Sequence, residues 1–279
     1  MSPVIVAVGQ TTIDTILIDN KAPWVHIGGS AYIPARIWAE FGTPVGLLSC
    51  IGNGLQLSEL AANNLDLRGV TKVSGPSTSI ELHYSNQNLI KLRVIPGAAQ
   101  QLSISQVPDD YFNASLFYIG PAPINFLVEL TEMLSTRKVN IAFSPKEDFP
   151  SLAQAEMKQI LSRCKFCFFN ERELPLVTNI ISPHDAISTV HELGTEIVIV
   201  TKGRRGVTIS TREAGSFDLA PTTVVLTDNP IGAGDCFAAI FLASSISGLS
   251  VRDSAERAIA YTERWLMNRK QSSYLEAKD

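Results

Sequence analysis

The chain has 279 residues, of which 45% are hydrophobic and 18% are charged, so it can build a sizeable core and intrinsic disorder is excluded. The formal net charge is −4 and the largest basic block is the pair Arg204-Arg205, which argues against nucleic acid as a partner. The apolar runs are too short to span a membrane and the first residues lack a signal-peptide pattern. We therefore expect a cytoplasmic protein without a membrane partner.

Apolar runs of strand length alternate with helix-length amphipathic segments along the chain. We expect strands at residues 4–8, 45–49, 116–119, 139–143, 166–169 and 196–201, and helices at 31–41, 55–63, 126–135, 152–163 and 183–193. A hairpin at 207–210 and 216–219 and a final helix at 252–268 complete the chain. This alternation predicts an α/β fold with a mostly parallel central sheet and helices on both faces. In such sheets, ligands bind beyond the carboxyl ends of the strands.

Two pairs of short strands interrupt the alternation, at 14–18 with 25–27 and at 77–84 with 89–95. We predict that these insertions, near 14–27 and 77–95, form a small separate sheet; the alternative is that they extend the main sheet. A separate sheet could act as a lid that excludes water from a reacting group. Its exposed apolar residues would also suit a homodimer formed through the lid.

The segment Gly232-Ala233-Gly234-Asp235 precedes an uncharged, helix-like stretch at residues 236–246. A helix N-terminus carries a partial positive charge and unpaired N–H donors, so it suits a phosphate. A carboxylate at the same place would repel that phosphate, but it could take the proton from a hydroxyl that attacks it. The alternative is that Asp235 only caps the helix and that the glycines only allow close packing.

Three further segments carry polar or glycine signals. Gly28 and Gly29 open the helix at 31–41 and allow a ligand to approach the backbone, although close packing explains them equally well. Asp14 suits a grip on sugar hydroxyls, or else it caps a turn. Asn170 and Glu173 have the spacing of a capping box, and their oxygens also suit Mg²⁺ held through water.

A glycine-containing turn, Thr201-Lys202-Gly203-Arg204-Arg205-Gly206, follows the strand at 196–201. Hydroxyl and basic groups in such a turn could hold nucleotide phosphates or a ribose, whereas the simpler interpretation is a tight turn. Arg93, in the second inserted hairpin, could pair with an anionic group of a substrate, or else it is a solvated surface arginine.

The order of these motifs resembles that of the ribokinase-like carbohydrate kinases, the PfkB family, over essentially the whole sequence. The resemblance implies a three-layer α/β/α ribokinase-like fold with a β-sheet lid in one domain, residues 1–279. It implies a kinase that uses ATP and Mg²⁺ to phosphorylate a hydroxyl of a small molecule, a sugar or a sugar-like alcohol such as a cyclitol or sugar acid.

The resemblance also assigns roles to the motif residues. Asp235 would be the general base, with an anion hole at Gly232, Ala233 and Gly234. Glu173 and Asn170 would organise Mg²⁺ through water. The nucleotide side would include Thr201, Gly203, Gly206 and Asn229, and the substrate side Asp14, Gly28, Gly29 and Arg93.

Two departures from the family pattern leave questions open. Asn229 and Pro230 stand where the family usually has Asp-Thr or Asp-Pro, which leaves a monovalent-cation site undecided. Ile33 stands where many members carry an asparagine that contacts sugar hydroxyls.

These departures leave two alternatives to a sugar kinase. One is a nucleoside kinase in which aromatic residues stack on a base, for which Trp24, Tyr32 and Tyr84 are candidates. The other is a catalytically silent sugar-binding regulator.

Overall fold

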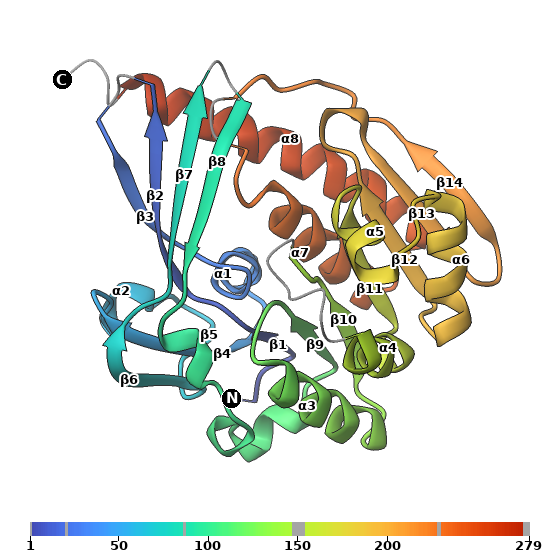
Figure 1. Cartoon of the computed structure of the whole chain (residues 1–279), viewed down its shortest axis with the longest axis horizontal. Helices are drawn as coiled ribbons and strands as arrows, with labels where there is room; N and C mark the ends of the chain where they lie inside the picture. The colour runs from blue at the N-terminus through green and yellow to red at the C-terminus, as the bar shows by residue number, and fades with distance from the viewer. Residues whose placement is uncertain (1, 20–21, 86–87, 147–153, 228–229, 276–279) are drawn as a thin grey trace.

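The structure is a computed structural model that describes residues 2–19, 22–85, 88–146, 154–227 and 230–275, with only the backbone of 88 and 270–275. Over these residues the chain forms eight α-helices and two sheets (Figure 1). No helix among them is long and apolar enough to cross a membrane.

The main sheet has ten strands in the order β14-β13-β12-β11-β10-β9-β1-β4-β5, with β6 also paired to β4. Its strands are β1 (Ile5–Val8), β4 (Val45–Asn53), β5 (Leu65–Asp66), β6 (Val70–Pro76), β9 (Leu116–Ile119), β10 (Asn140–Phe143), β11 (Phe166–Asn170), β12 (Ile197–Thr201), β13 (Val207–Thr211) and β14 (Gly215–Leu219). All pairs are parallel except β12–β13 and β13–β14. The predicted, mostly parallel sheet and its terminal hairpin are confirmed.

The helices cover both faces of this sheet. Their bounds are α1 (Tyr32–Glu40), α2 (Leu57–Leu60), α3 (Ile124–Thr136), α4 (Gln154–Arg163), α5 (Glu173–Thr178), α6 (Pro183–Leu193), α7 (Ala233–Ile246) and α8 (Val251–Leu275). In addition there are short 3-10 helices, η1 (Ala98–Gln101), η2 (Ile104–Gln106), η3 (Asp109–Asn113) and η4 (Gly203–Arg205).

Alternate residues of each parallel strand enter two separate cores. In β1, Ile5 and Ala7 pack with residues of α1, α7 and α8, whereas Val6 and Val8 pack with residues of α3, α4 and α6. A strand buried on both faces reads as a continuous apolar run, and residues 5–8 are all fully buried. The two cores give the three-layer α/β/α architecture.

The small sheet has the order β3-β2-β7-β8, with β2 (Thr12–Ile18), β3 (Trp24–Gly28), β7 (Ser79–Ser85) and β8 (Asn88–Ile95). It forms its own hydrogen-bonded sheet instead of extending the main one, as predicted. Because β2 follows β1 after a few residues, the small sheet stands beyond the carboxyl end of β1 (Figure 1). The homodimer expected through this sheet remains a prediction.

One predicted helix is largely wrong. Residues 55–63 form only the single turn α2, because the chain then turns at Asn64, whose φ is +64°, and enters β5. Leu65 and Asp66 pair with Val45 and Gly46 at the start of β4. Pairing with the sheet edge therefore overrides the helical pattern of the segment.

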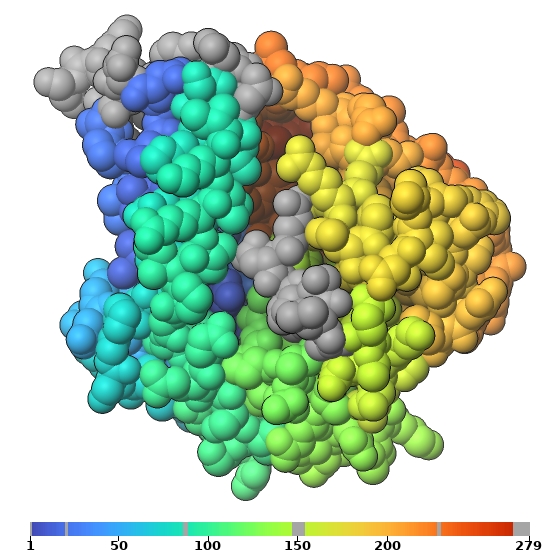
Figure 2. Space-filling view, viewed as in Figure 1, coloured from blue at the N-terminus to red at the C-terminus, as the bar shows by residue number. Residues whose placement is uncertain are grey.

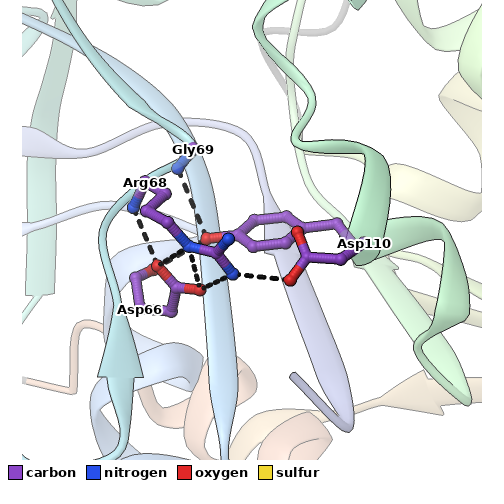
Figure 3. Close-up of polar contacts among 5 residues, drawn as sticks. Asp66, Arg68, Gly69 and Asp110 are labelled. Carbon is purple, nitrogen blue, oxygen red and sulfur yellow. Dashed lines mark hydrogen bonds and ion pairs between the residues drawn. The ribbon is translucent and has the colours of Figure 1, made fainter. Parts of the chain in front are cut away.

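A charged cluster holds η3 against the lateral edge of the main sheet that β5 and β6 form (Figure 3). The Arg68 guanidinium donates to both carboxylate oxygens of Asp66 and, at 2.7 Å, to Asp110. The fully buried Tyr111 donates its hydroxyl to the Asp66 carbonyl at 3.0 Å and accepts from the Gly69 N–H at 3.3 Å. We call these residues the Arg68 cluster: Asp66, Arg68, Gly69, Asp110 and Tyr111.

Candidate active site

Two cavities meet at the carboxyl edge of the main sheet. The small-sheet cavity, of about 590 Å³, lies between the small sheet and the ends of β1, β10, β11 and β12. The loop cavity, of about 750 Å³, is lined by residues 201–207, the chain before α7, and helices α7 and α8. Both cavities share six lining residues, namely Arg172, Thr201, Gly203, Pro230, Ala233 and Gly234. Figure 2 shows the hollow between the small sheet and the yellow and orange segments.

The N-terminus of α7 stands at this junction. Gly232 precedes the helix with a φ of +80°, which a residue with a side chain rarely adopts, and a Cβ there would lie 2.9 Å from Ile33. A Cβ on Gly234 would meet no atom within 4 Å, so the space beside it is open. The Ala233 N–H donates to the Pro230 carbonyl at 3.1 Å, so of the three predicted anion-hole N–H groups this one already has a protein partner.

Asp235, in the first turn of α7, is 7% exposed and lines the small-sheet cavity. Its Oδ1 accepts from the Lys146 ammonium at 3.0 Å and from the Tyr118 hydroxyl at 3.3 Å. Burial raises the pKa of Tyr118, and the charge of Asp235 adds to that rise. Burial opposes the charge of Lys146, but the charge and hydrogen bond of Asp235, together with Tyr118 and Glu173, outweigh it and hold the pKa of Lys146 above its ordinary value. Lys146 is therefore a cation at neutral pH.

Asp14 lies on the other wall of the small-sheet cavity and is 1% exposed. Its Oδ1 accepts from the Thr12 hydroxyl at 2.5 Å. A Cβ on Gly28 would lie 1.9 Å from Oδ2, so the glycine makes room for this carboxylate. Burial raises the pKa of Asp14 to about 6, against the Thr12 bond, and the nearby charge of Asp235 contributes to the rise. Gly29, at φ +110°, lines the cavity, whereas Gly28 acts through Asp14.

Buried polar atoms near Asp14 lack a partner among the residues that the structure describes. Ser30, 6% exposed, lines the cavity, and its hydroxyl makes no hydrogen bond there. Both ring nitrogens of His26 are buried without a partner, with Nε2 3.8 Å from Asp14 Oδ2. Because buried polar groups are nearly always hydrogen-bonded, this wall suits a polar ligand.

Arg269, from the C-terminal helix α8, contacts both the small sheet and the loop that precedes α7. Its guanidinium donates to the Ile231 carbonyl at 2.6 Å and lies 4.0 Å from the ring centre of Trp265 and 5.9 Å from that of Trp24. Trp24 in turn stacks on His26 in β3. One side chain thus connects α8, the small sheet and the loop before Gly232.

Asn170 and Glu173 form the capping-box bonds that their spacing predicts. Asn170 Oδ1 accepts from the N–H of Glu173 at 2.8 Å, and Glu173 accepts from the N–H of Asn170 at 2.8 Å. Both also line the small-sheet cavity. No group of three His, Cys, Asp or Glu residues in the described ranges could hold a metal by itself. An amide and a carboxylate oxygen beside a cavity fit Mg²⁺ that keeps several waters and binds phosphates.

The turn after β12 lies at the junction of the cavities. Thr201 and Gly203 line both, and Gly206 lines the loop cavity. Gly206 has a φ of +91°, and a Cβ there would lie 2.0 Å from the Leu219 carbonyl oxygen, which explains the glycine by packing. Asn229, with Asp228, lies outside the described residues.

The structure does not bring four sequence candidates to the cavity. Arg93 is not among its lining residues but pairs with Glu81 at 3.6 Å; its strand neighbours Leu92 and Val94 face the cavity, so alternation turns Arg93 away. Tyr32 packs in the main core and Tyr84 in the core of the small sheet. Trp24 stacks on His26. The stacking role proposed for these three aromatic residues therefore has no support here.

Sequence reasoning missed the two residues that contact Asp235. Lys146 follows the end of β10, and residues beyond parallel strand ends were expected to line a site, so this position could have been found. Tyr118 lies within β9 and reads as one more apolar core residue. Its contact with Asp235, 117 residues away, follows only from the packing of α7 on the sheet.

Residues 3–262 match the sequence pattern of a family described as pfkB family carbohydrate kinase. The chain belongs to this family. A cytidine kinase of Thermococcus kodakarensis is 30% identical over 272 residues, 94% of this chain and 96% of that protein. A nucleoside kinase of Methanocaldococcus jannaschii is 24% identical over 265 residues, 88% of this chain and 84% of that protein.

The solved structures confirm the fold of this pfkB family member. Arabidopsis thaliana ribokinase, in complex with ribose and ATP, superposes with a TM-score of 0.81 at 17% identity, over 96% of this chain and 93% of that one. The chain is thus a phosphotransferase with a ribokinase-like fold, a sugar or nucleoside kinase, and the family implies ATP as its phosphoryl donor.

Proposed function

We propose that this pfkB family member is an ATP-dependent kinase that phosphorylates a hydroxyl of a nucleoside, with Asp235 as general base. The observation that carries the proposal is the position of Asp235 at the helix mouth where the two cavities meet. ATP in the loop cavity would direct its γ-phosphate toward α7, and an acceptor in the small-sheet cavity would reach it from the opposite side. Once the acceptor hydroxyl and the γ-phosphate are held in line, phosphoryl transfer mainly requires a base for the hydroxyl proton and groups that neutralise the charge on the phosphate.

The chemical step is a direct transfer between the two ligands. The acceptor oxygen forms a bond to the γ-phosphorus while the bond to the β–γ bridging oxygen breaks, and ADP leaves with that electron pair. Asp235 accepts the hydroxyl proton. The N–H groups of Gly232 and Gly234 and the positive end of α7 stabilise the charge on the phosphoryl oxygens.

Asn170 and Glu173 would hold Mg²⁺ through its waters, and the bound ion would neutralise the charge of the phosphates. Thr201, Gly203 and Gly206 would border the nucleotide.

Asp14 and Gly29 would hold the acceptor, with Ser30 as an additional contact whose hydroxyl has no partner among the described residues. A carboxylate and a hydroxyl suit the vicinal hydroxyls of a ribose ring. The two curated relatives favour a nucleoside over a free sugar. A sugar or cyclitol is the second candidate, because the small sheet lines the cavity with aliphatic side chains, among them Ile80, Leu82 and Leu92, and not with the predicted aromatic ones.

The test is ADP release with ATP and Mg²⁺ over a panel of nucleosides, pentoses, hexoses, cyclitols and sugar acids. We expect kcat/KM to be highest for a nucleoside, with cytidine the first to measure. A higher value for a free sugar would replace the nucleoside by the second candidate. Release of ADP with none of the acceptors above the rate with water would overturn the kinase proposal and favour a silent binding protein.

A further inference from the structure

Lys146 carries a charge at the point where phosphoryl transfer would occur. It lies three residues after the end of β10, lines the small-sheet cavity, and keeps 31% of its side chain exposed. Its ammonium is 3.0 Å from Oδ1 of Asp235, whose side chain is 10% exposed. Glu173 lines the same cavity, and its negative charge, like that of Asp235, raises the pKa of Lys146. Lys146 thus shares one cavity with the base and with the residue that would organise Mg²⁺.

The contact between Lys146 and Asp235 does not use all the hydrogen-bond donors of the ammonium or both oxygens of the carboxylate. Lys146 and Tyr118 both donate to Oδ1, so neither of them uses Oδ2. An ammonium has three donor hydrogens, and within the described residues Lys146 lies at ion-pair distance from Asp235 while it also lines the cavity. A partly buried ion pair gains little stability because desolvation offsets the attraction, so stability alone is a weak reason to keep it here.

We propose that Lys146 is a catalytic residue that binds the transferred phosphoryl group and fixes Asp235 at the same time. This inference rests on the proposed kinase function. The ammonium bridges Oδ1 and an oxygen of the γ-phosphate, which leaves Oδ2 free to accept the proton of the acceptor hydroxyl. As the γ-phosphorus moves from the ADP oxygen to the acceptor oxygen, Lys146 and the N–H groups at the start of α7 surround the group from two sides.

The experiment compares K146M and K146R with wild type and with K72M. The control lysine, Lys72, is exposed on β6 and donates to Gln56 at 2.8 Å, remote from both cavities. We expect K146M to lower kcat by about 100-fold, the effect of removing one donor from an oxyanion hole, with KM for the acceptor changed by less than about threefold. K146R keeps the charge and should retain more activity than K146M, and K72M should match wild type.

A second measurement needs no acceptor. In wild type, ADP with aluminium fluoride, which mimics the transferring phosphoryl group, should bind more tightly than ADP alone. K146M should lose about 100-fold of this affinity while its affinity for ADP stays within about threefold of wild type. A purely structural role would instead lower the melting temperature and weaken both complexes alike. K146Q provides a second neutral variant if K146M does not fold.

The two proposals fail in different ways. If wild type phosphorylates an acceptor and folded K146M does so at the same rate, the role of Lys146 is overturned and the kinase function stands. If wild type phosphorylates nothing in the panel, the kinase function is overturned, and the aluminium fluoride measurement decides whether Lys146 binds a phosphoryl group. If ADP does not bind to wild type, both are overturned.

Discussion

Two clusters of charges lie at different edges of the main sheet. The Arg68 cluster is at the lateral edge formed by β5 and β6, where one guanidinium donates to Asp66 and Asp110 (Figure 3). The Asp235 cluster, made of Asp235, Lys146 and Tyr118, is at the carboxyl edge, where Lys146 and Tyr118 share one carboxylate oxygen beside a cavity. Each cluster contains a buried tyrosine whose hydroxyl donates to an aspartate residue, to a backbone carbonyl in the first and to a carboxylate in the second.

The two clusters differ in how many of their hydrogen-bonding atoms already have a partner in the protein. Arg68 binds both oxygens of Asp66, so that pair is complete and serves to hold η3 on the sheet. In the Asp235 cluster, Oδ2 of Asp235 accepts from neither Lys146 nor Tyr118. Asp235 and Lys146 both line the small-sheet cavity, which a ligand can fill. Similar interactions therefore serve folding at one edge and, in our proposal, chemistry at the other. Substitutions should separate the two.

The largest expected effect is that of Asp235→Asn. Loss of the general base should lower kcat by 10²–10⁴-fold, the usual contribution of such a group. Asp110→Asn, the matched change in the Arg68 cluster, should leave kcat within about twofold of wild type. Steady-state ADP release on the best acceptor measures both. An undiminished kcat in Asp235→Asn would contradict the role of base.

The contribution of Asp14 to the unfolding free energy should depend on pH in the opposite sense to that of the Arg68 cluster, which Asp14→Asn should reveal. The pKa of Asp14 rises from 3.8 to about 6 on folding, so the folded chain binds this proton more tightly and the unfolding free energy falls as pH rises between these values. The ionised carboxylate costs up to about 3 kcal/mol above pH 6, which Asp14→Asn should recover. Burial raises the pKa of Asp66, but its bonds to Arg68 outweigh that effect and lower it. Stability from that cluster is therefore lost as pH falls below 3.8.

Urea unfolding of wild type and Asp14→Asn from pH 4 to pH 8 measures this difference. If the carboxylate holds the acceptor, the KM of wild type for the acceptor should also fall as pH rises through about 6, and Asp14→Asn should lose this dependence. A stability gap between the two proteins that is the same at pH 4 and pH 8 would contradict the raised pKa.

The two tyrosines allow the finest comparison. Tyr111→Phe removes a buried hydroxyl and leaves the Gly69 N–H without its partner, so unfolding free energy should fall by about 1–2 kcal/mol at unchanged kcat. Tyr118→Phe removes a longer bond to Asp235 and should lower kcat about fivefold with a smaller loss of stability. Equal effects of both changes on kcat, or on stability, would erase the distinction between the two clusters.

The sequence predicted the elements whose bounds depend on neighbouring residues, such as helix caps, buried strands and glycines. Helix α6 begins and ends where the sequence predicts, because the Ser182 hydroxyl accepts from the Asp185 N–H, Pro183 occupies the first helical position, and Gly194 follows the helix. Strands β1, β4, β9, β10, β11 and β12 were predictable because they are buried on both faces, whereas the partly exposed edge strands β5 and β6 were not predicted. The glycines at 28, 29 and 232 were predictable as positions of close approach.

The contacts across the fold were not predictable in this way. The distances from Lys146 and Tyr118 to Asp235 depend on how α7 packs against the sheet and beside α1, where the Trp38 indole donates to the Ala239 carbonyl at 2.7 Å. Arg93 lies outside the cavity lining and pairs with Glu81, which follows from the alternation of its strand and not from its charge. Residues 55–63 carry a helical pattern that the pairing of β5 with β4 overrides.

The contacts of Arg269 bear on how the protein is made. Trp24 and His26 lie in the first tenth of the chain, and the guanidinium that packs on Trp24 and donates to the Ile231 carbonyl comes from the last turns of α8. During synthesis the chain emerges from its N-terminus, so the small sheet can pair its strands long before this partner exists. The contact that joins the small sheet to α8 can therefore form only after α8 has been synthesised, so this wall of the cavity is among the last parts of the fold to be completed.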